Sequence, residues 1–422
     1  MSANSQPAYD RLDIAPPASG AAEAWRGLRS WNPDALLFGL GISCVPISVA
    51  ISESLLGGAL LFRVFALARR REQLYFPRIL GFWLAWAALE LVAWFQSPDL
   101  RAGLGEIRHL LLLVFMFLVL PALSRPAQRV AVWRGVIAAA TLSSLFLIGH
   151  FFFRLFFHGA ETNPVIYLRS GGLLHHWMVY ATVEVVVFAA LLELLHYYPE
   201  ERWWLAPALL VNVAAIVLSL TRMLWICSLL LLALHLAWRR SRWTWAVPAA
   251  PFVLFLLAPG PVRSRIIESS RPDYYSNAER VQMLKVGWKV IRANPITGIG
   301  PGRVEALYTN YLSSGDAVPA YRGHLHNNLA ELAAEFGLPT AAAATIFVVV
   351  LLWDLRKEHK RAVHRDELFV CRTALLALTG FLAAGFFDYT YGHSLGLILL
   401  TFAVLPPLSP AARMQESPDP PR

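Results

Sequence analysis

The sequence predicts an all-α membrane protein that crosses the bilayer about twelve times. Of its 422 residues, 57% are hydrophobic and 15% are charged, and the mean hydropathy is positive. This balance is typical of polytopic membrane proteins and not of soluble domains. Apolar runs long enough to cross about 30 Å of hydrocarbon recur along nearly the whole chain. Within lipid, a backbone satisfies its own hydrogen bonds by forming helix.

The expected spans cover residues 33–48, 50–68, 78–96, 106–123, 130–153, 175–195, 202–219, 222–238, 242–258, 338–354, 368–386 and 389–407. The first two are short and are compatible with tilted or re-entrant helices. Residues 1–32 lack the apolar core of a cleaved signal peptide, and we expect a disordered or interfacial tail there and a second tail at 408–422. The chain therefore divides into helices at 33–258, a large loop at 259–337 and helices at 338–407.

Basic residues gather in every second loop, for example at Arg69-Arg70-Arg71 and Arg239-Arg240-Ser241-Arg242. By the positive-inside rule these loops and both termini are cytoplasmic. The net charge of +9 is then a topology signal, and we expect membrane lipids and not nucleic acid as partners. The three cysteines, Cys44, Cys227 and Cys371, lie in or beside different spans and do not predict a disulfide framework or a thiolate metal site.

The loop at 259–337 is expected on the exported side and is the one loop long enough to fold. A capping box, Ser276-Asn-Ala-Glu279, predicts a helix that ends at Asn294-Pro295. Its expected packed positions are Val281, Leu284, Trp288 and Ile291. Arg280 falls on the same stripe and should turn inward. A buried guanidinium needs a partner, which is either an anionic ligand or a carboxylate from elsewhere in the fold.

The next segment, Thr297-Gly-Ile-Gly-Pro-Gly-Arg303, is rich in glycine. It follows a helix and contains proline, so it does not predict a dinucleotide site, which follows a strand. We expect a tight, close-packed turn, with backbone amides facing a phosphate as the alternative.

The segment from Tyr321 to Pro339 crowds histidines, amides and carboxylates into an apolar chain. Leu325, Leu329, Leu332 and Phe336 predict the packed face of a helix. On that helix His324 would share a polar face with Glu331 and Glu335, where a solvated or ion-paired histidine is expected. His326 would border small residues, leaving room for a substrate, and is the better candidate for a general base. A metal site on both histidines is disfavoured, because positions i and i+2 of a helix do not face each other.

Arg222 begins the eighth expected span at its exported edge. An anion at the interface and a lipid phosphate reached by snorkelling explain it equally well.

Four short motifs follow one another along the chain. They are Ser170-Gly-Gly172 before a span, Thr221-Arg222 at the start of a span, Arg280 with Asn294-Pro-Ile-Thr-Gly-Ile-Gly300, and His326-Asn-Asn-Leu329 with Glu335-Phe-Gly337. In these motifs, in length and in the position of the large loop, the chain resembles bacterial O-antigen ligases and the wider group of O-antigen polymerases and protein O-oligosaccharyltransferases. One departure is His175-His176, where relatives often carry proline or asparagine.

This resemblance implies a glycosyltransferase of the membrane C-type class in the bacterial inner membrane, with its active site on the periplasmic side. It implies metal-independent, inverting transfer of O-antigen from undecaprenyl diphosphate to the lipid A core oligosaccharide, without a cofactor. Arg222 and Arg280 would hold the diphosphate, and His326 would deprotonate the acceptor hydroxyl. Further substrate contacts are expected from His324, Asn327, Arg154, Arg169, Arg263 and Arg265, with lipid headgroups as the alternative for the arginines.

Three other activities remain open. A polymerase would extend the lipid-linked glycan, and a protein O-oligosaccharyltransferase would glycosylate exported proteins. A secondary transporter would also have many spans and would use carboxylates within them, such as Glu90 and Glu184. The concentration of polar motifs in one exported loop and the lack of a two-half repeat favour an enzyme.

Overall fold

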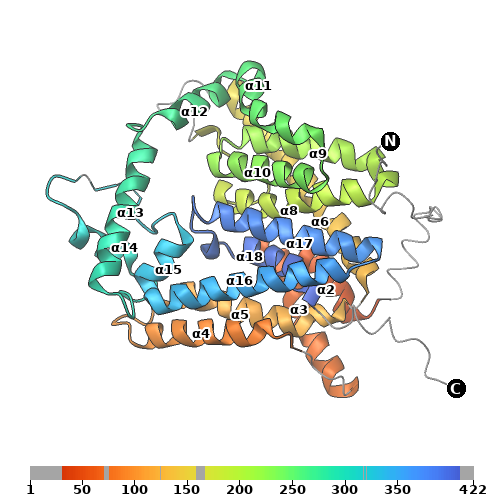
Figure 1. Cartoon of the computed structure of the whole chain (residues 1–422), viewed down its shortest axis with the longest axis horizontal. Helices are drawn as coiled ribbons and strands as arrows, with labels where there is room; N and C mark the ends of the chain where they lie inside the picture. Colours follow the sequence, from red (N-terminus) through yellow and green to blue (C-terminus); the bar gives the residue numbers. More distant parts are fainter. Residues whose placement is uncertain are drawn as a thin grey trace, which may run out of the picture.

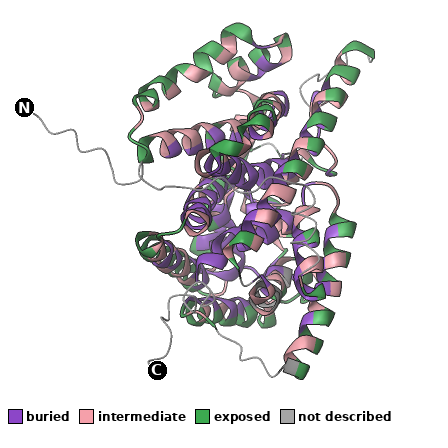
Figure 2. Cartoon of the chain, turned by 90° about the vertical axis from the view of Figure 1, so that its right-hand side faces the viewer, coloured by how far each residue is buried: buried purple, intermediate pink, exposed green. Residues whose placement is uncertain are grey.

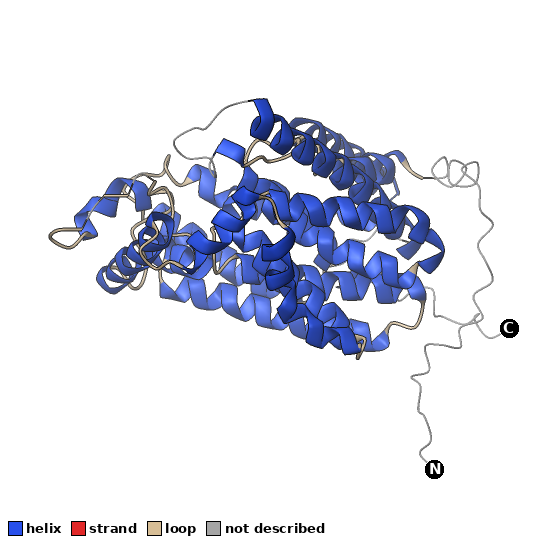
Figure 3. Ribbon diagram, turned by 90° about the horizontal axis from the view of Figure 1, so that it is seen from above, coloured by secondary structure: helices blue, strands red, loops and turns tan. Residues whose placement is uncertain are grey.

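The computed structural model describes residues 31–70, 76–123, 125–157, 167–316, 318–319 and 321–408. Within these ranges the chain forms helices and connecting turns, without a strand (Figure 3). The all-α prediction is therefore confirmed for the described part of the chain. The two predicted tails lie almost entirely outside it.

The elements, in chain order, are α2 (Pro33–Ser43), α3 (Val49–Arg70), α4 (Ile79–Phe95), α5 (Leu104–Val119), η2 (Leu120–Ala122), α6 (Pro126–Phe157), α8 (Trp177–Tyr197), η3 (Pro199–Glu201), α9 (Arg202–Leu218), α10 (Arg222–Trp238), η4 (Arg242–Ala249), α11 (Ala250–Leu257), α12 (Gly260–Ser270), α13 (Tyr275–Ala293), α14 (Val304–Leu307), η5 (Tyr308–Tyr311), α15 (Asn328–Phe336), α16 (Leu338–Arg361), α17 (Arg365–Ala384), η6 (Thr390–Gly392), α18 (Ser394–Val404) and η7 (Pro406–Leu408).

Six helical stretches in the described chain, those of α3, α6, α8, α9, α16 and α17, are long and apolar enough to cross a membrane. Five shorter apolar stretches, which include α4 and α10, also coincide with predicted spans. By the length and composition of its apolar helices, the chain is thus a multi-pass membrane protein. The number of twelve crossings, the C-type architecture and the division at residues 259 and 337 stay predictions.

The helices α8 and α17 form the centre of the bundle. In α8 and α17, 89% and 78% of the most apolar segment is buried, against 28% to 39% in the other four long helices. These two helices pack against each other, and Figure 2 shows the buried residues concentrated in the middle of the bundle. The outer helices have exposed apolar faces, as expected for helices that contact lipid.

Helices α12 to α15 lie together at one end of the bundle, and α13 runs across that end (Figure 1). The predicted helix with the capping box is α13, but the box does not form. The helix begins at Tyr275 without a side-chain cap, and Ser276 lies inside it. The Ser276 hydroxyl instead accepts a hydrogen bond from Arg222 Nη2 at 3.2 Å. Arg222 thus binds the hydroxyl that the capping box would use.

The predicted packed face of α13 is also partly wrong. Val281, Leu284 and Trp288 are 53%, 45% and 61% exposed, whereas the buried residues are Met283, Val286, Gly287, Val290 and Ile291. Apolar residues occupy both sides of this helix, so their spacing does not decide which side packs. On the buried side, a Cβ at Gly287 would lie 2.7 Å from Leu325 Cδ1, so the glycine lets the Leu325 side chain pack directly against the helix.

Candidate active site

A cavity of about 1570 Å³ opens between α13 and the end of the bundle. Polar residues from segments far apart in the sequence line one part of it. They include Arg169, His176, Arg222, Arg265, Ser276, Asn277, Arg280, Tyr321, His324, His326, Asp388 and His393, with the carboxylates Glu106 and Glu279 also in the lining. This size is typical of a site for a large ligand rather than for a single sugar or ion.

The histidine that the sequence favours as a base pairs with a buried carboxylate. His326 Nδ1 lies 2.7 Å from Asp388 Oδ1, and Asp388 is only 1% exposed. Burial alone would raise the pKa of Asp388, but hydrogen bonds from His326 and His393 hold it well below its usual range. Asp388 is therefore an ionised acceptor, and His326 donates its Nδ1–H to it. The Nε2 lone pair of His326 is then free to take a proton.

The predicted helical separation of the two histidines is wrong. The helix begins only at Asn328, with the Asn327 side chain accepting from Ala330 N as its cap, so both histidines precede it. His326 has a left-handed backbone with φ +52°, and its ring centroid lies 4.2 Å from that of His324. Both rings line the cavity, and His324 does not lie on an acidic helical face.

Because the two histidines precede the helix, the argument from helical spacing against a metal no longer holds. His324, His326 and Asp388 each offer a ligand atom within 4.8 Å of the others. However, His324 Nδ1 accepts a hydrogen bond from His326 N at 3.1 Å, which places the proton of the neutral ring on Nε2, the nitrogen nearer Asp388. A metal on Nε2 would force the proton onto Nδ1, against the N–H of His326. The hydrogen bonds thus suit a base better than a metal ligand set.

His324 is held neutral. Burial and the neighbouring His326 lower its pKa to about 3, although the charge of Asp388 opposes the shift. It therefore acts as a neutral hydrogen-bonding group beside the base, not as the ion-paired histidine that the helical pattern suggested.

Buried amide and carboxylate groups hold the two halves of the dyad together. Asn328 accepts a hydrogen bond from Thr390 N at 2.8 Å and donates to Thr390 Oγ1 at 2.7 Å. Glu331, expected on a polar face, is 1% exposed and accepts the N–H of Leu325 at 2.6 Å. The turn with His326 and the turn with Asp388 are therefore fixed relative to each other before a substrate binds.

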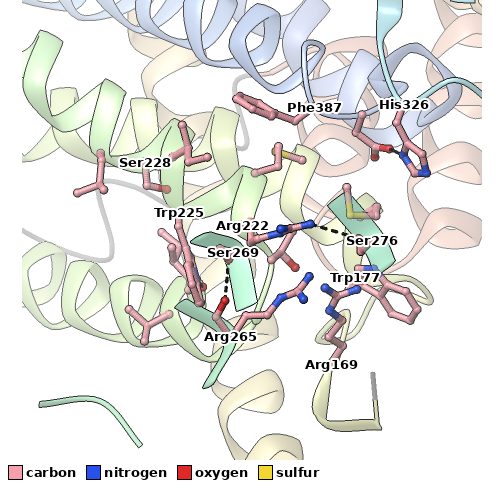
Figure 4. A pocket seen from close by; sticks show the side chains of 18 of the residues that line it. Arg169, Trp177, Arg222, Trp225, Ser228, Arg265, Ser269, Ser276, His326 and Phe387 are labelled. Carbon is pink, nitrogen blue, oxygen red and sulfur yellow. Dashed lines mark hydrogen bonds and ion pairs between the residues drawn. The ribbon is translucent and has the colours of Figure 1, made fainter. Parts of the chain in front are cut away.

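Three arginines gather on another wall of the cavity. Figure 4 shows the guanidinium groups of Arg169, Arg222 and Arg265 converging on one region. Arg222 donates to Ser276 Oγ and Asn277 Oδ1. Arg265 is 3% exposed and forms an ion pair with Glu268 at 3.2 Å, and its Nε has no partner among the described residues.

Arg169 is crowded by the other cations. Its Nε is also buried without a partner among the described residues, and its guanidinium stacks on Trp177 at 5.5 Å. Burial, with the charge of Arg265, lowers its pKa to about 10, so it remains a cation at neutral pH. Mutually repelling, partly desolvated guanidinium groups in a cavity can bind a polyanion.

Arg280 turns inward as predicted and lines the cavity, and its pairing with an anionic ligand or a carboxylate stays a prediction. It donates a hydrogen bond to the backbone carbonyl of Phe387, the residue before Asp388. Burial lowers its pKa, and the charge of Asp388 opposes that effect. Arg280 thus lies between the arginine cluster and the His326–Asp388 dyad.

The structure places the other expected contacts differently. Arg154 lies outside the cavity wall and donates to the carbonyls of Tyr167 and Arg169, so that it supports the segment that carries Arg169. Arg263 donates to the carbonyl of Ala258, and Asn327 caps α15. None of these three side chains lines the cavity.

The glycine-rich segment is a packing turn, as expected. Ile299 N and Gly300 N donate to the carbonyls of Ala334 and Glu335, at 2.9 Å and 3.0 Å. Gly298 has φ +66°, and a Cβ there would lie 2.3 Å from the carbonyl carbon of Glu335. Because the amides of 299 and 300 already have partners in the chain, the alternative of a phosphate site is not supported for them.

The rest of the cavity wall is apolar. It is made by α9, α10, η4 and α11 and includes Ile216, Trp225, Leu229, Leu232 and Leu254. Neither η4 nor α11 buries any residue. An apolar trough lined by α9, α10, η4 and α11 therefore continues from the arginine cluster.

Asp388 is the site residue that the sequence does not reveal. It stands in a short turn between two spans, without periodicity or a motif, and its partner His326 is 62 positions away. An acidic residue in a short turn at the same end of the bundle was the one available signal.

Residues 207–345, about a third of the chain, match the model of the O-antigen ligase family. The matched segment includes Arg222, Arg265, Arg280 and His326. No curated protein matches the chain.

Proposed function

We propose that the protein is an O-antigen ligase, which transfers glycan from undecaprenyl diphosphate to the lipid A core oligosaccharide at the periplasmic face of the bacterial inner membrane. The observation that carries this proposal is the single cavity that joins a histidine base, an arginine cluster and an apolar trough. These three parts match the three parts of the reaction, which are an acceptor hydroxyl, a diphosphate and a polyprenyl chain.

The donor would bind with its diphosphate at Arg169, Arg222 and Arg265 and its polyprenyl chain along α9, α10 and α11. A diphosphate offers several anionic oxygens, and guanidinium groups bind such oxygens with good geometry. The arginines also stabilise the charge that develops on the leaving diphosphate.

In the transfer step, His326 Nε2 takes the proton of the acceptor hydroxyl. The hydroxyl oxygen attacks the anomeric carbon, and the bond from that carbon to the diphosphate oxygen breaks. The electron pair leaves with the diphosphate, and attack from the opposite side inverts the anomeric centre. Asp388 stabilises the imidazolium that forms on His326 at a distance of 2.7 Å. No metal ion or second acid is required, because a diphosphate is a good leaving group.

Deletion of the protein in its host tests the biological role. A ligase deletion removes the long-chain lipopolysaccharide ladder from a gel and accumulates polymerised, undecaprenyl-linked glycan. A cap of one repeat unit on the core would mean a polymerase instead. Intact lipopolysaccharide with unglycosylated exported proteins would mean a protein O-oligosaccharyltransferase.

Purified variants test the mechanism. His326→Ala should reduce transfer by about a hundredfold or more, which is the usual contribution of a general base. Arg292→Ala is the control, because Arg292 is exposed at the end of α13 and does not line the cavity. Near-normal transfer by His326→Ala would overturn the assignment of the base.

A further inference from the structure

His176 lines the cavity directly before α8. Its Nδ1 accepts a hydrogen bond from Met178 N at 3.2 Å and so caps the helix. Its ring packs on Trp177 with centroids 4.1 Å apart. The cap fixes the tautomer of the neutral ring, because a nitrogen that accepts cannot carry the proton. Nε2 therefore carries the hydrogen.

The surroundings keep this ring neutral. Burial lowers the pKa of His176, and the charge of His393 lowers it further, while Asp388 opposes the shift and Arg169 supports it. The ring is thus a hydrogen-bond donor at Nε2 without a net charge at neutral pH.

Contacts and the cavity lining place the ring beside both reactive parts of the site. The His176 ring packs on Trp177, on which the Arg169 guanidinium also stacks at 5.5 Å, and His176, Asp388 and His393 line the same cavity. In an in-line displacement, the anomeric carbon lies between the leaving diphosphate and the attacking hydroxyl. A side chain that reaches both regions therefore lies beside the sugar that is transferred.

We propose that His176 binds the first sugar of the donor, by donating its Nε2–H to an oxygen of that sugar, either a hydroxyl or an N-acetyl carbonyl. This inference rests on the proposed function, since it takes the arginine cluster as the diphosphate site. It makes His176 a substrate-binding residue that distinguishes a glycan-bearing lipid from the bare lipid diphosphate.

Binding to two probes tests the proposal without requiring turnover. The probes are undecaprenyl diphosphate and undecaprenyl diphosphate that carries one N-acetylhexosamine, each titrated into the full-length protein in nanodiscs. The variant is His176→Asn, because asparagine is a good helix cap and keeps α8 intact but does not reach as far into the cavity. The matched control is His175→Asn, because the His175 side chain is exposed like that of His176 but does not line the cavity.

We expect His176→Asn to weaken binding of the sugar-bearing lipid by about tenfold, which is at the upper end for one lost neutral hydrogen bond. Binding of the bare lipid diphosphate should stay within about twofold of wild type, as should both affinities of His175→Asn. Equal weakening of both lipids by His176→Asn, or no weakening, would overturn the proposal while leaving the proposed function in place. A wild-type protein that binds neither lipid would overturn both.

The variant His176→Ala separates binding from folding. Alanine removes the cap as well as the donor, so this variant should lose thermal stability in addition to affinity for the sugar-bearing lipid. Full affinity in His176→Ala would also contradict the proposed contact.

Discussion

Replacing Asp388 by asparagine tests the chemistry of the dyad, because the change removes the charge and keeps the shape. Asp388 is 1% exposed, and its two carboxylate oxygens accept from His326 at 2.7 Å and from His393 at 3.4 Å. An amide has one acceptor oxygen and one donor nitrogen, so it cannot serve both histidines. If the amide nitrogen faces His326, the ring must carry its proton on Nε2, and the lone pair turns away from the substrate.

The size of the effect follows from that geometry. If the amide oxygen still accepts from His326, the imidazolium loses only its stabilising charge, and the loss of kcat should be about a hundredfold. If the amide nitrogen takes that place, the tautomer is wrong, and the loss should approach about ten thousandfold. These limits correspond to about 2.7 and 5.4 kcal/mol of transition-state stabilisation.

The assay is transfer from the lipid-linked donor to the lipid A core acceptor at saturating donor, with purified Asp388→Asn protein whose thermal unfolding is compared with wild type. Asp273→Asn is the control. Asp273 follows the end of α12, is exposed and pairs with Arg271, and it does not line the cavity. The reasoning is refuted if folded Asp388→Asn protein keeps kcat within about threefold of wild type.

Three further changes probe packing, protonation and the lipid trough. Gly298→Ala should lower the free energy of unfolding by about 2 kcal/mol or more, because Gly298 has φ +66° and a Cβ there would lie 2.3 Å from the Glu335 carbonyl carbon. Gly260→Ala is the control and should be near neutral, because a Cβ there would meet no atom within 4 Å. Burial and the charge of Glu106 raise the pKa of Glu335 to about 8. The stability that protonated Glu335 contributes is fully present below the unfolded pKa near 4.5 and is lost as pH rises through about 8. The melting temperature should therefore fall between pH 5 and pH 9. In Glu335→Gln it should fall less. Leu229→Trp should narrow the trough and raise KM for a long-chain donor several-fold but not for a short-chain analogue, and equal effects on both donors would argue against a lipid chain there.

The positions of the long apolar helices could be predicted from the sequence, because apolar runs report directly on burial in lipid. The inward turn of Arg280 was also predicted. The face of α13 was not, since Val281 and Leu284 are as apolar as the residues that pack, and the buried side includes the contact of Gly287 with Leu325. Helical periodicity cannot report a contact between two segments.

The candidate site was predicted in part. His326 and the arginines could be proposed from motifs and topology, but the helical phase of the histidines was wrong because Asn327, not an earlier residue, caps α15. A left-handed residue before a cap interrupts the periodicity on which the prediction depended. Asp388 was missed for a different reason, since pairing across 62 positions is a property of the fold and leaves no local pattern.

The elements η4 and α11 pack loosely against the bundle, and this affects how a substrate enters the cavity. Because neither element buries a residue, moving them sideways disturbs little packing, whereas the dyad is fixed by buried hydrogen bonds. Under the proposed function, a long polyprenyl tail can slide in from the bilayer without loosening the catalytic groups. The fluidity of the surrounding lipid, more than any motion of the histidines, would then set how fast the enzyme is loaded.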